Sequence, residues 1–308
     1  MARRFKRVAV LMGGPSSERD VSLRSGAAVT AGLTEAGYDT VAIDVKGRTL
    51  DLPSGIEAVF IALHGEFGED GEVQSMLEAQ DVPYTGSGPR ASWLSFNKQA
   101  SKKVLMRKGV PTPRFELVRS GSPCPFPLPV VVKPPAQGSS IGVYRVRTPA
   151  EWGPALADGL RFAPEIMVEV FIPGRELTVG IVGDMVLPVI EIQAPDDWYD
   201  YTAKYTKGQT QYLVPAPLEP VLAQQCQQVA RATFDALGCR GVGRVDIRLS
   251  DTGEMMVLEL NNVPGFTETS LLPKAAREAG LSFPVLCARI LESAGTDRQP
   301  GLTGTEMA

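Results

Sequence analysis

The clearest structural pattern in the chain is GVGRVDIRL at residues 241–249, followed after the turn SDTG by EMMVLELN at residues 254–261. Side chains on a β-strand point alternately to its two faces. In the first stretch the apolar residues therefore share one face, and Arg244, Asp246 and Arg248 share the other. The composition of the turn predicts that the two stretches form a β-hairpin with one buried face.

Pairing across this hairpin predicts a cluster of polar side chains. An even-numbered turn sets Asp246 opposite Glu259. It also sets Arg244 opposite Asn261. Two carboxylates and an amide oxygen suit Mg²⁺ that is held jointly with phosphate oxygens. A charged strand face in water would show the same alternation. We favour a metal-nucleotide site because the next segment, NVPGFT at residues 262–267, exposes backbone N–H groups that can hold an oxyanion.

The first 90 residues have the pattern of a parallel α/β sheet, because strands alternate with a helix. An apolar run ends at Gly13-Gly14, and cap-type residues then begin a helix. The predicted elements are strands at residues 7–12, 40–43 and 58–63 and a helix that reaches about residue 36. His64 follows the last strand and opens a charged glycine loop, a position where α/β sheets tend to carry their sites.

The rest of the chain has mixed α+β character. The predicted strands lie at residues 129–133, 143–146, 166–171, 177–182 and 185–190, and the predicted helices at 91–108, 218–237, 270–279 and 282–293. Lys133 stands before Gly138-Ser139-Ser140, a loop that can fold donors over phosphates, although a lysine there is also typical of solvated surface. Residues 195–217 have no clear period, and their tyrosines favour a functional loop over a disordered one.

Composition limits the classes of function. The chain has 308 residues, of which 44% are hydrophobic and 21% charged, so that its core needs neither disulfides nor metals to fold. The net charge of −4 argues against nucleic acid as the main partner. Because there is no signal-peptide pattern and no run of about 20 apolar residues, we expect no membrane association and a cytoplasmic location.

The four cysteines are widely spaced and form no CxxC pair, which favours reduced thiols over a zinc site or a disulfide framework. Cys226 falls on one helical face with Leu222, Val229, Thr233 and Leu237. This spacing predicts core packing, and it gives no support for catalysis by cysteine.

Six motifs stand in the order that is typical of one family. They are GGPSSER at residues 13–19, ALHG at 62–65 with EDG at 69–71, YTGSG at 84–88, Lys133-Pro134 with GSS at 138–140, GRVD at 243–246, and ELN at 259–261 with PGFT at 264–267. From about residue 7 to residue 290, the chain resembles the D-alanine–D-alanine ligase family of the ATP-grasp superfamily.

The resemblance implies an α/β (α+β) ATP-grasp fold in three parts. These are a Rossmann-like substrate-binding domain at residues 1–90, a central subdomain at 91–172, and a C-terminal subdomain at 173–308 with a lid loop at 194–217. It implies ATP-dependent ligation of two D-alanine molecules through an acyl phosphate, with release of ADP and phosphate, for peptidoglycan precursor synthesis. ATP, two Mg²⁺ (or Mn²⁺) ions and a homodimer are further expectations.

The resemblance also assigns roles around the nucleotide. The implied ATP ligands are Lys98 and Lys133 at the phosphates, Ser140 in the phosphate loop, Glu169 and Glu176 at adenine and ribose, and the backbone of Phe171 and Ile172. The implied metal ligands are Asp246, Glu259 and Asn261, while Arg244 and the N–H group of Gly265 would stabilise the oxyanion. From exposure alone, Glu169 and Glu176 would be ordinary charges at strand edges.

Other residues are assigned to the two D-alanine molecules. The implied set begins with Glu18 at the first ammonium group, hydrogen-bonded with Ser139 and Tyr205 into a triad. It also includes His64 near the first substrate, Ser270 and the Leu271 backbone at the second carboxylate, and Lys204 at the γ-phosphate. Relatives that make D-alanyl-D-lactate commonly have histidine at the tyrosine position, so Tyr205 favours an amine nucleophile.

The chain departs from the common family pattern at three positions. Gln137 replaces a glutamate, Asn97 an aspartate and Asn262 a threonine. None of these changes removes an implied ligand, although Gln137 alters the charge of the phosphate loop.

Three other classes of function share some of these features. An ATP-grasp ligase for another amino or hydroxy acid would have the same nucleotide motifs, but Glu18, Ser139 and Tyr205 argue against it. A regulatory protein that binds a nucleotide without turnover would not need to keep Arg244, Asp246, Glu259 and Asn261 together. A dinucleotide-binding domain lacks support because the first glycine turn has no GxGxxG spacing.

Overall fold

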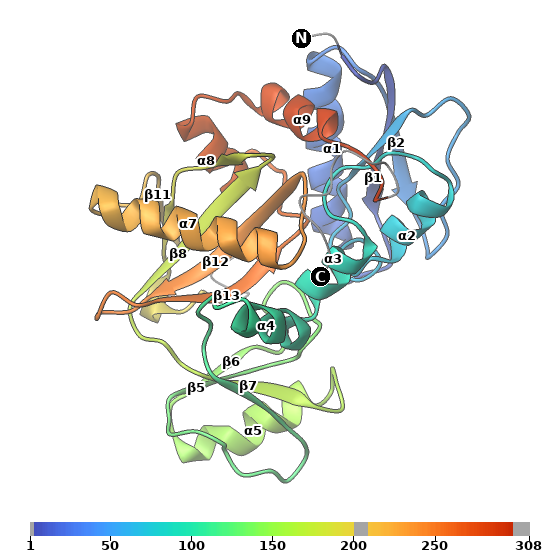
Figure 1. Ribbon diagram of the computed structural model, residues 1–308. Coiled ribbons are helices and arrows are strands. Elements are labelled where there is room, and N and C mark those ends of the chain that lie inside the picture. Colours follow the sequence, from blue (N-terminus) through green and yellow to red (C-terminus); the bar gives the residue numbers. More distant parts are fainter. Residues whose placement is uncertain (1–2, 200–208, 298–308) are drawn as a thin grey trace.

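The computed structural model describes residues 3–199 and 209–297, which form three sheets with helices packed between and around them (Figure 1). The N-terminal sheet is parallel in the order β2-β1-β3, as the alternation of strands and helix predicts. Its elements are β1 (Arg7–Gly13), α1 (Arg19–Glu35), β2 (Asp39–Val45) and β3 (Ala58–Ile61).

The turn after β1 depends on glycine. Gly13 and Gly14 have φ angles of 85° and 86°, which side chains with a Cβ rarely adopt. The N–H group of Gly14 donates to the carbonyl of Val45 at 2.8 Å, so that the turn is fixed to the end of β2. Helix α1 therefore begins next to the carboxyl ends of the strands, where Glu18 and His64 also lie.

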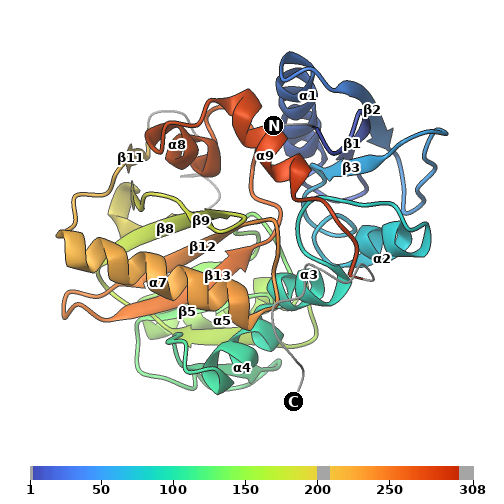
Figure 2. The ribbon, with the colours of Figure 1, turned by 45° about the horizontal axis from the view of Figure 1, so that its top comes forward.

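The largest sheet has the order β11-β10-β8-β12-β13, with β9 paired to β8 (Figure 2). Its elements are β8 (Arg175–Val182), β9 (Met185–Val186), β10 (Ile190–Gln193), β11 (Gln211–Leu213), β12 (Val242–Leu249) and β13 (Met255–Asn261). Helix α7 (Pro220–Ala236) lies across one face, and α8 (Leu271–Glu278) packs on β8. Cys226 of α7 is fully buried in the core of this sheet, as its helical spacing predicts. The strand predicted at residues 185–190 is instead split, because the chain turns after β9 and starts β10 at Ile190.

The hairpin of β12 and β13 has the predicted pairs at its functional end. Asp246 pairs with Glu259 and Arg244 with Asn261. The turn, however, is odd-numbered, because Leu249 pairs with Met255. An extra residue in β13, Leu258, forms a β-bulge that shifts the register by one and restores the Asp246–Glu259 pair.

The bulge corrects one detail of the predicted alternation. A regular strand places Val257 on the same face as Glu259. In the structure Val257 instead pairs with Ile247 and is fully buried in the core under α7. The polar ligands Glu259 and Asn261 line the cleft described below, together with Leu258 and Leu260 of the same strand.

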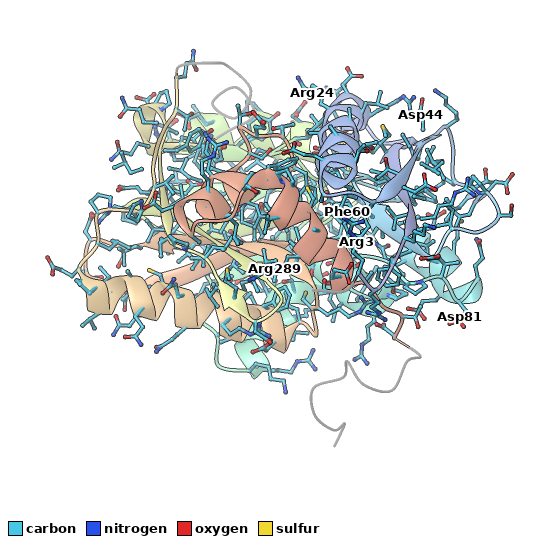
Figure 3. The ribbon with its side chains drawn as sticks, turned by 90° about the horizontal axis from the view of Figure 1, so that it is seen from above. Arg3, Arg24, Asp44, Phe60, Asp81 and Arg289 are labelled. Carbon is cyan, nitrogen blue, oxygen red and sulfur yellow. The ribbon has the colours of Figure 1, made fainter. Side chains whose placement is uncertain are left out.

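The third sheet is antiparallel in the order β4-β7-β5-β6. Its elements are β4 (Phe115–Val118), β5 (Val130–Lys133), β6 (Tyr144–Val146) and β7 (Ile166–Val170), with α5 (Pro149–Gly159) against it. Its buried apolar cluster draws only on residues 118–168, whereas the N-terminal sheet shares a core with α8 and α9 (Phe283–Glu292). Phe60 of β3, labelled in Figure 3, packs edge-on against Phe266 with ring centroids 5.1 Å apart.

The helix predicted at residues 91–108 is two helices, α3 (Pro89–Phe96) and α4 (Lys98–Arg107), after α2 (Glu72–Ala79). The break falls at Asn97, whose backbone is extended and whose side-chain oxygen accepts from the N–H group of Ala100 at 2.9 Å. Asn97 is thus the N-cap that starts α4 and sets the position of Lys98. Leu105 of α4 packs into the core of the largest sheet. The domain boundaries predicted at residues 90 and 172 stay predictions.

No helix within residues 3–199 or 209–297 is long and apolar enough to cross a bilayer.

Replacing the N-cap gives a test of this helix start. Asn97→Ala removes the acceptor for Ala100 and is expected to lower the free energy of unfolding by about 1 kcal/mol. Asn97→Asp keeps a capping oxygen and is expected to stay close to the parent. Thermal unfolding of the three proteins measures the difference, and an Ala variant as stable as the Asp variant would contradict the cap.

Candidate active site

A cleft lies between the four-stranded sheet and the sheet that carries β12 and β13. Most of the side chains that the sequence assigned to a nucleotide or a metal meet there. The lining includes Lys98, Lys133, Gly138, Ser139, Ser140, Glu169, Phe171, Ile172, Glu176, Asp246, Glu259 and Asn261. The same cleft is also lined by Glu69, Trp198, Tyr199, Arg248 and Leu258, which the residue assignments did not include.

The carboxylate of Asp246 is the centre of a polar network on β12. Arg244 donates to it from Nε at 3.1 Å and from Nη2 at 2.9 Å. Thr178, its neighbour on β8, donates at 2.6 Å, and the amide of Asn261 donates at 3.0 Å. Burial works against the charge of Arg244, but Asp246 outweighs it and raises the pKa of Arg244. The network holds both charges in place, with Asp246 at the cleft wall.

The second carboxylate faces a lysine from another element. Glu259 Oε2 lies 3.3 Å from Lys98 Nζ, which also donates to the carbonyl of Gln137 at 2.7 Å. Lys98 therefore connects α4 to β13 and to the start of the phosphate loop. A phosphate that enters here would compete with Glu259 for this ammonium group.

The donor set fits a hard divalent cation. Asp246 and Glu259 are direct cross-strand partners, and Asn261 stands two residues further along β13 on the cleft side. The Asn261 amide turns its nitrogen to Asp246, and a half-turn of this group presents its oxygen instead. Carboxylate and amide oxygens are the ligands that Mg²⁺ takes together with phosphate oxygens.

Glu169 is buried between two lysines. Its oxygens lie 2.8 Å from Lys133 Nζ and 2.8 Å from Lys102 Nζ, and its side chain is only 2% exposed. Burial alone raises the pKa of Glu169, but Lys102 and Lys133 together outweigh it and lower the pKa. Glu169 thus stays ionised at the floor of the cleft, and it is not the strand-edge surface charge that exposure statistics favour.

Sequence reasoning missed Lys102. This lysine is 1% exposed and also donates to Thr112 Oγ1 at 2.5 Å. It stands four residues after Lys98 on α4, so the two lysines share one face of the helix. That spacing was the available signal, but nothing in the sequence indicates that Glu169 lies opposite.

The titration of Lys102 gives a second test. Burial lowers the pKa of Lys102 to about 8, although Glu169 opposes this shift, whereas an exposed lysine in the unfolded chain keeps a pKa of 10.5. Between these two pH values the unfolded chain binds more protons, so the contribution of Lys102 to the free energy of unfolding rises with pH. The slope is at most about 1.4 kcal/mol per pH unit.

Lys102→Met removes the titrating group. Between about pH 8 and about pH 10, the free energy of unfolding of the parent is therefore expected to rise relative to that of the variant. Urea unfolding at a series of pH values measures it. Lys103→Met, at an exposed position on the same helix, is the matched control and should show no such trend. A difference between the parent and Lys102→Met that is independent of pH would contradict the assignment.

The phosphate loop contacts the N-terminal part of the chain. Ser139 and Ser140 have φ angles of 51° and 57°, and the Ser139 hydroxyl donates to Glu18. A Cβ at Gly138 would come within 2.3 Å of Glu18 Oε2, so the Glu18 carboxylate packs directly against the loop backbone. The Glu18–Ser139 contact that the resemblance implies is therefore formed among the described residues.

His64 is buried at 5% exposure and is bonded at both ring nitrogens. Nε2 lies 3.0 Å from Ser25 Oγ and Nδ1 lies 3.3 Å from Glu69 Oε1. Burial raises the pKa of Glu69, although the hydrogen bond with His64 opposes this. Ser25 Oγ also accepts from the N–H group of Phe266 at 3.4 Å, which links His64 to the loop that follows β13.

That loop carries the remaining predicted residues. Gly265 lies against Ser270, because a Cβ at Gly265 would come within 2.8 Å of Ser270 Oγ. Ser270 is the N-cap residue of α8, and its hydroxyl accepts from the N–H group of Thr267 at 3.1 Å. Leu271 is the first residue of the helix, where backbone N–H groups attract anions.

Arg248, which strand alternation predicts on the polar face of β12, makes the contacts at the end of the cleft beyond β7. Arg248 donates to the carbonyls of Ile172 and Gly174 at 3.1 and 2.7 Å. It also donates to Glu176 at 3.2 Å. Arg248 therefore fixes the connection from β7 to β8, which includes the backbone assigned to adenine.

Two assigned residues, Lys204 and Tyr205, lie outside the described residues.

Each of the three residues that depart from the family pattern makes a hydrogen bond in the structure. Asn97 caps α4, the Gln137 carbonyl accepts from Lys98, and the Asn262 amide donates to the carbonyl of Glu69 at 3.1 Å.

Comparisons with known proteins agree with this geometry. Residues 46–87 match the family described as D-ala D-ala ligase N-terminus, and residues 105–292 match D-ala D-ala ligase C-terminus. The D-alanine--D-alanine ligase of Syntrophotalea carbinolica is 48% identical over 295 residues, which cover 94% of this chain and 96% of the relative. That of Methylacidiphilum infernorum is 44% identical over 287 residues, covering 93% and 95%.

Solved structures are similar over nearly the whole chain. The D-alanine--D-alanine ligase from Bacillus anthracis complexed with ATP has a TM-score of 0.82 at 32% identity and covers 94% of this chain and 97% of its own. The VanG D-Ala:D-Ser ligase from Enterococcus faecalis has a TM-score of 0.82 at 26% identity, with coverages of 93% and 98%.

A cleft between two antiparallel sheets, with lysines on one wall and metal-type ligands on the other, defines the ATP-grasp class of ligases. With the sequence matches along most of its length, the chain belongs to the D-alanine–D-alanine ligase family.

Proposed function

We propose that this protein joins two molecules of D-alanine to D-alanyl-D-alanine with conversion of ATP to ADP and phosphate, in the synthesis of peptidoglycan precursors. One observation carries the proposal. Asp246, Glu259 and Asn261 line the cleft together with Lys98 and Lys133. Lys98 Nζ lies 3.3 Å from Glu259, and Arg244 pairs with Asp246, so that cations and hard oxygen ligands gather at one place. This is the arrangement that phosphoryl transfer needs, because its catalysis is mostly positioning and charge neutralisation.

In the proposed reaction, the carboxylate of the first D-alanine attacks the γ-phosphate of ATP to give an acyl phosphate and ADP. The amine of the second D-alanine then attacks the acyl carbon, and phosphate leaves. Lys98 and Lys133 neutralise phosphate charge, and Glu169 fixes Lys133 in position. Arg244 and the N–H group of Gly265 stabilise the oxyanion of the tetrahedral intermediate.

Asp246, Glu259 and Asn261 would hold two Mg²⁺ or Mn²⁺ ions. When bound, these ions supply positive charge that screens the β- and γ-phosphates. The fit of the donor set supports this assignment, since two carboxylates and an amide stand on one face of the hairpin.

The D-alanine side of the site rests on residues from three segments. Glu18, bonded to Ser139, would hold the ammonium group of the first substrate. His64 would lie beside that substrate, held by Ser25 and Glu69. Ser270 and the Leu271 backbone would take the second carboxylate at the start of α8. Lys204 and Tyr205 keep their proposed roles at the γ-phosphate and as part of the Glu18 triad.

The remaining expectations are also proposals. The chain acts in the cytoplasm as a homodimer, with domains at residues 1–90, 91–172 and 173–308 and a lid at 194–217. Gel filtration with light scattering on the purified protein tests the dimer.

The decisive experiment is phosphate release from ATP and Mg²⁺ by the purified chain. D-alanine, L-alanine, D-alanine with D-serine and D-alanine with D-lactate are offered separately, and the products are identified by mass. Release with D-alanine alone and a dipeptide product is the expected result. No phosphate release with D-alanine alone, but release with another pair of substrates, would rule out D-alanyl-D-alanine as the product. The assignment to ATP-dependent carboxylate-amine ligases would still hold.

The metal cluster has its own test. Asp246→Asn keeps the shape and the Thr178 contact but removes a charged ligand, and kcat is expected to fall by roughly 10²–10³ or more. Asp235→Asn, in the exposed ion pair with Arg231 on α7, is the control and should keep the parent rate. Equal unfolding midpoints for both variants would show that a lower kcat does not come from unfolding. A normal kcat for Asp246→Asn would contradict the assignment of Asp246 as a metal ligand.

A further inference from the structure

Two aromatic rings meet at the cleft from opposite sides. Phe171 follows β7 of the four-stranded sheet, whereas Trp198 follows the short 3₁₀ turn η1 (Pro195–Asp197) after β10 of the large sheet. Both rings line the cleft, and their centroids are 6.4 Å apart at an interplanar angle of 51°. Together they form an aromatic pair that spans the two sheets.

Arg145 of β6 contacts both rings of this pair. Its guanidinium carbon lies 5.2 Å from the centroid of Phe171 and 5.2 Å from that of Trp198. Its Nη2 group also donates to the carbonyl of Asp196 at 2.8 Å. Asp196 has φ 52° and ψ 24°, a left-handed backbone that Asp adopts more readily than most residues with a Cβ. One half-buried side chain thus contacts both rings of the aromatic pair and the left-handed turn at Asp196, two residues before Trp198.

Strand register explains why Arg145 faces the cleft. Arg145 pairs with Val131 on β5, and Val131 pairs with Glu169 on β7. Residues directly opposite on neighbouring strands share a face of the sheet. Val131 and Glu169 both line the cleft, so the side chain of Arg145 leaves the sheet on the cleft side at its β6 edge.

We propose that Arg145 is a positioning residue for the nucleotide base. Its guanidinium holds Phe171 and Trp198 together across the two sheets, so that the wall on which a purine would stack is formed before the nucleotide binds. This inference rests on the proposed function, because it names a residue that shapes the base end of the same cleft. Arg145 itself acts through the two rings and the Asp196 carbonyl.

The contacts at position 145 depend on the planar guanidinium of arginine, and a positive charge alone does not replace it. A planar guanidinium stacks on aromatic faces and at the same time donates in its plane to a carbonyl. A lysine ammonium can do one or the other but lacks the flat surface that contacts two rings. Arg145→Lys should therefore behave more like Arg145→Met than like the parent.

The test measures nucleotide binding and the environment of Trp198 in the full chain. The protein has three tryptophans, so Trp93→Phe with Trp152→Phe leaves Trp198 as the reporter. In this background, Arg145→Lys and Arg145→Met are compared with Arg147→Met, an exposed arginine two residues along, as matched control. The ligands are ADP and inorganic tripolyphosphate, each with Mg²⁺.

Both Arg145 variants are expected to bind ADP about tenfold more weakly and to show greater quenching of Trp198 by acrylamide before nucleotide is added. Tripolyphosphate affinity and the KM for D-alanine should stay within about twofold of the parent, because the base end alone is changed. The KM for ATP should rise while kcat stays near the parent value. A purely structural role would instead lower the unfolding midpoint and weaken both ligands alike.

The outcomes separate this inference from the proposed function. Unchanged ADP affinity and unchanged Trp198 quenching in Arg145→Lys, in a protein that ligates D-alanine, would overturn the positioning role alone. Equal losses for ADP and tripolyphosphate would overturn it as well. A parent chain that binds neither ADP nor ATP would overturn both the proposed function and this inference.

Discussion

The cleft depends on the register in which β13 pairs with β12. A shift of one residue along a strand turns every side chain to the other face. The odd-numbered turn would pair Asp246 with Leu258, and the single extra residue of the bulge is what brings Glu259 opposite Asp246 instead. Since Val257 remains buried under α7 on the turn side of the bulge, the strand supplies a core residue and a cleft ligand only two positions apart.

That register brings charges together, and each of these carboxylates is paired with at least one cation. Asp246 is held by Arg244, and Glu259 by Lys98. Glu169 lies between two lysines, so its site keeps an excess of one positive charge. Buried charges are stable only when they are paired and hydrogen-bonded. An incoming triphosphate therefore meets cations that are already fixed in place, which lowers the reorganisation that binding requires.

Alternation was enough to predict the parallel sheet and the hairpin pairs, and the residues that the motifs implied for a nucleotide and a metal do line the cleft. What they missed depends on contacts between distant segments. The bulge at Leu258 has no local signal, because the preceding residues of the strand are apolar without a break. The break between α3 and α4 does have a local signal, because Asn97 is a typical N-cap residue. The helical pattern of the sequence nevertheless continues past Asn97. Lys102 on α4 has the pattern of a surface lysine until Glu169 of β7 is placed opposite it.

Contacts across the cleft differ in kind from those within each sheet. The buried cluster of the four-stranded sheet contains only residues 118–168, so this unit has a core of its own. Besides the ring contact of Phe171 with Trp198, described contacts from its cleft face to the large sheet are directional, as when Arg145 donates to Asp196 or Arg248 to the Ile172 carbonyl. Directional contacts can be exchanged for contacts to a ligand at little cost in buried apolar area, whereas a shared apolar core cannot. A cleft that must admit a nucleotide between two sheets is therefore best joined by polar and cation–π contacts, and the observed division of cores has this property.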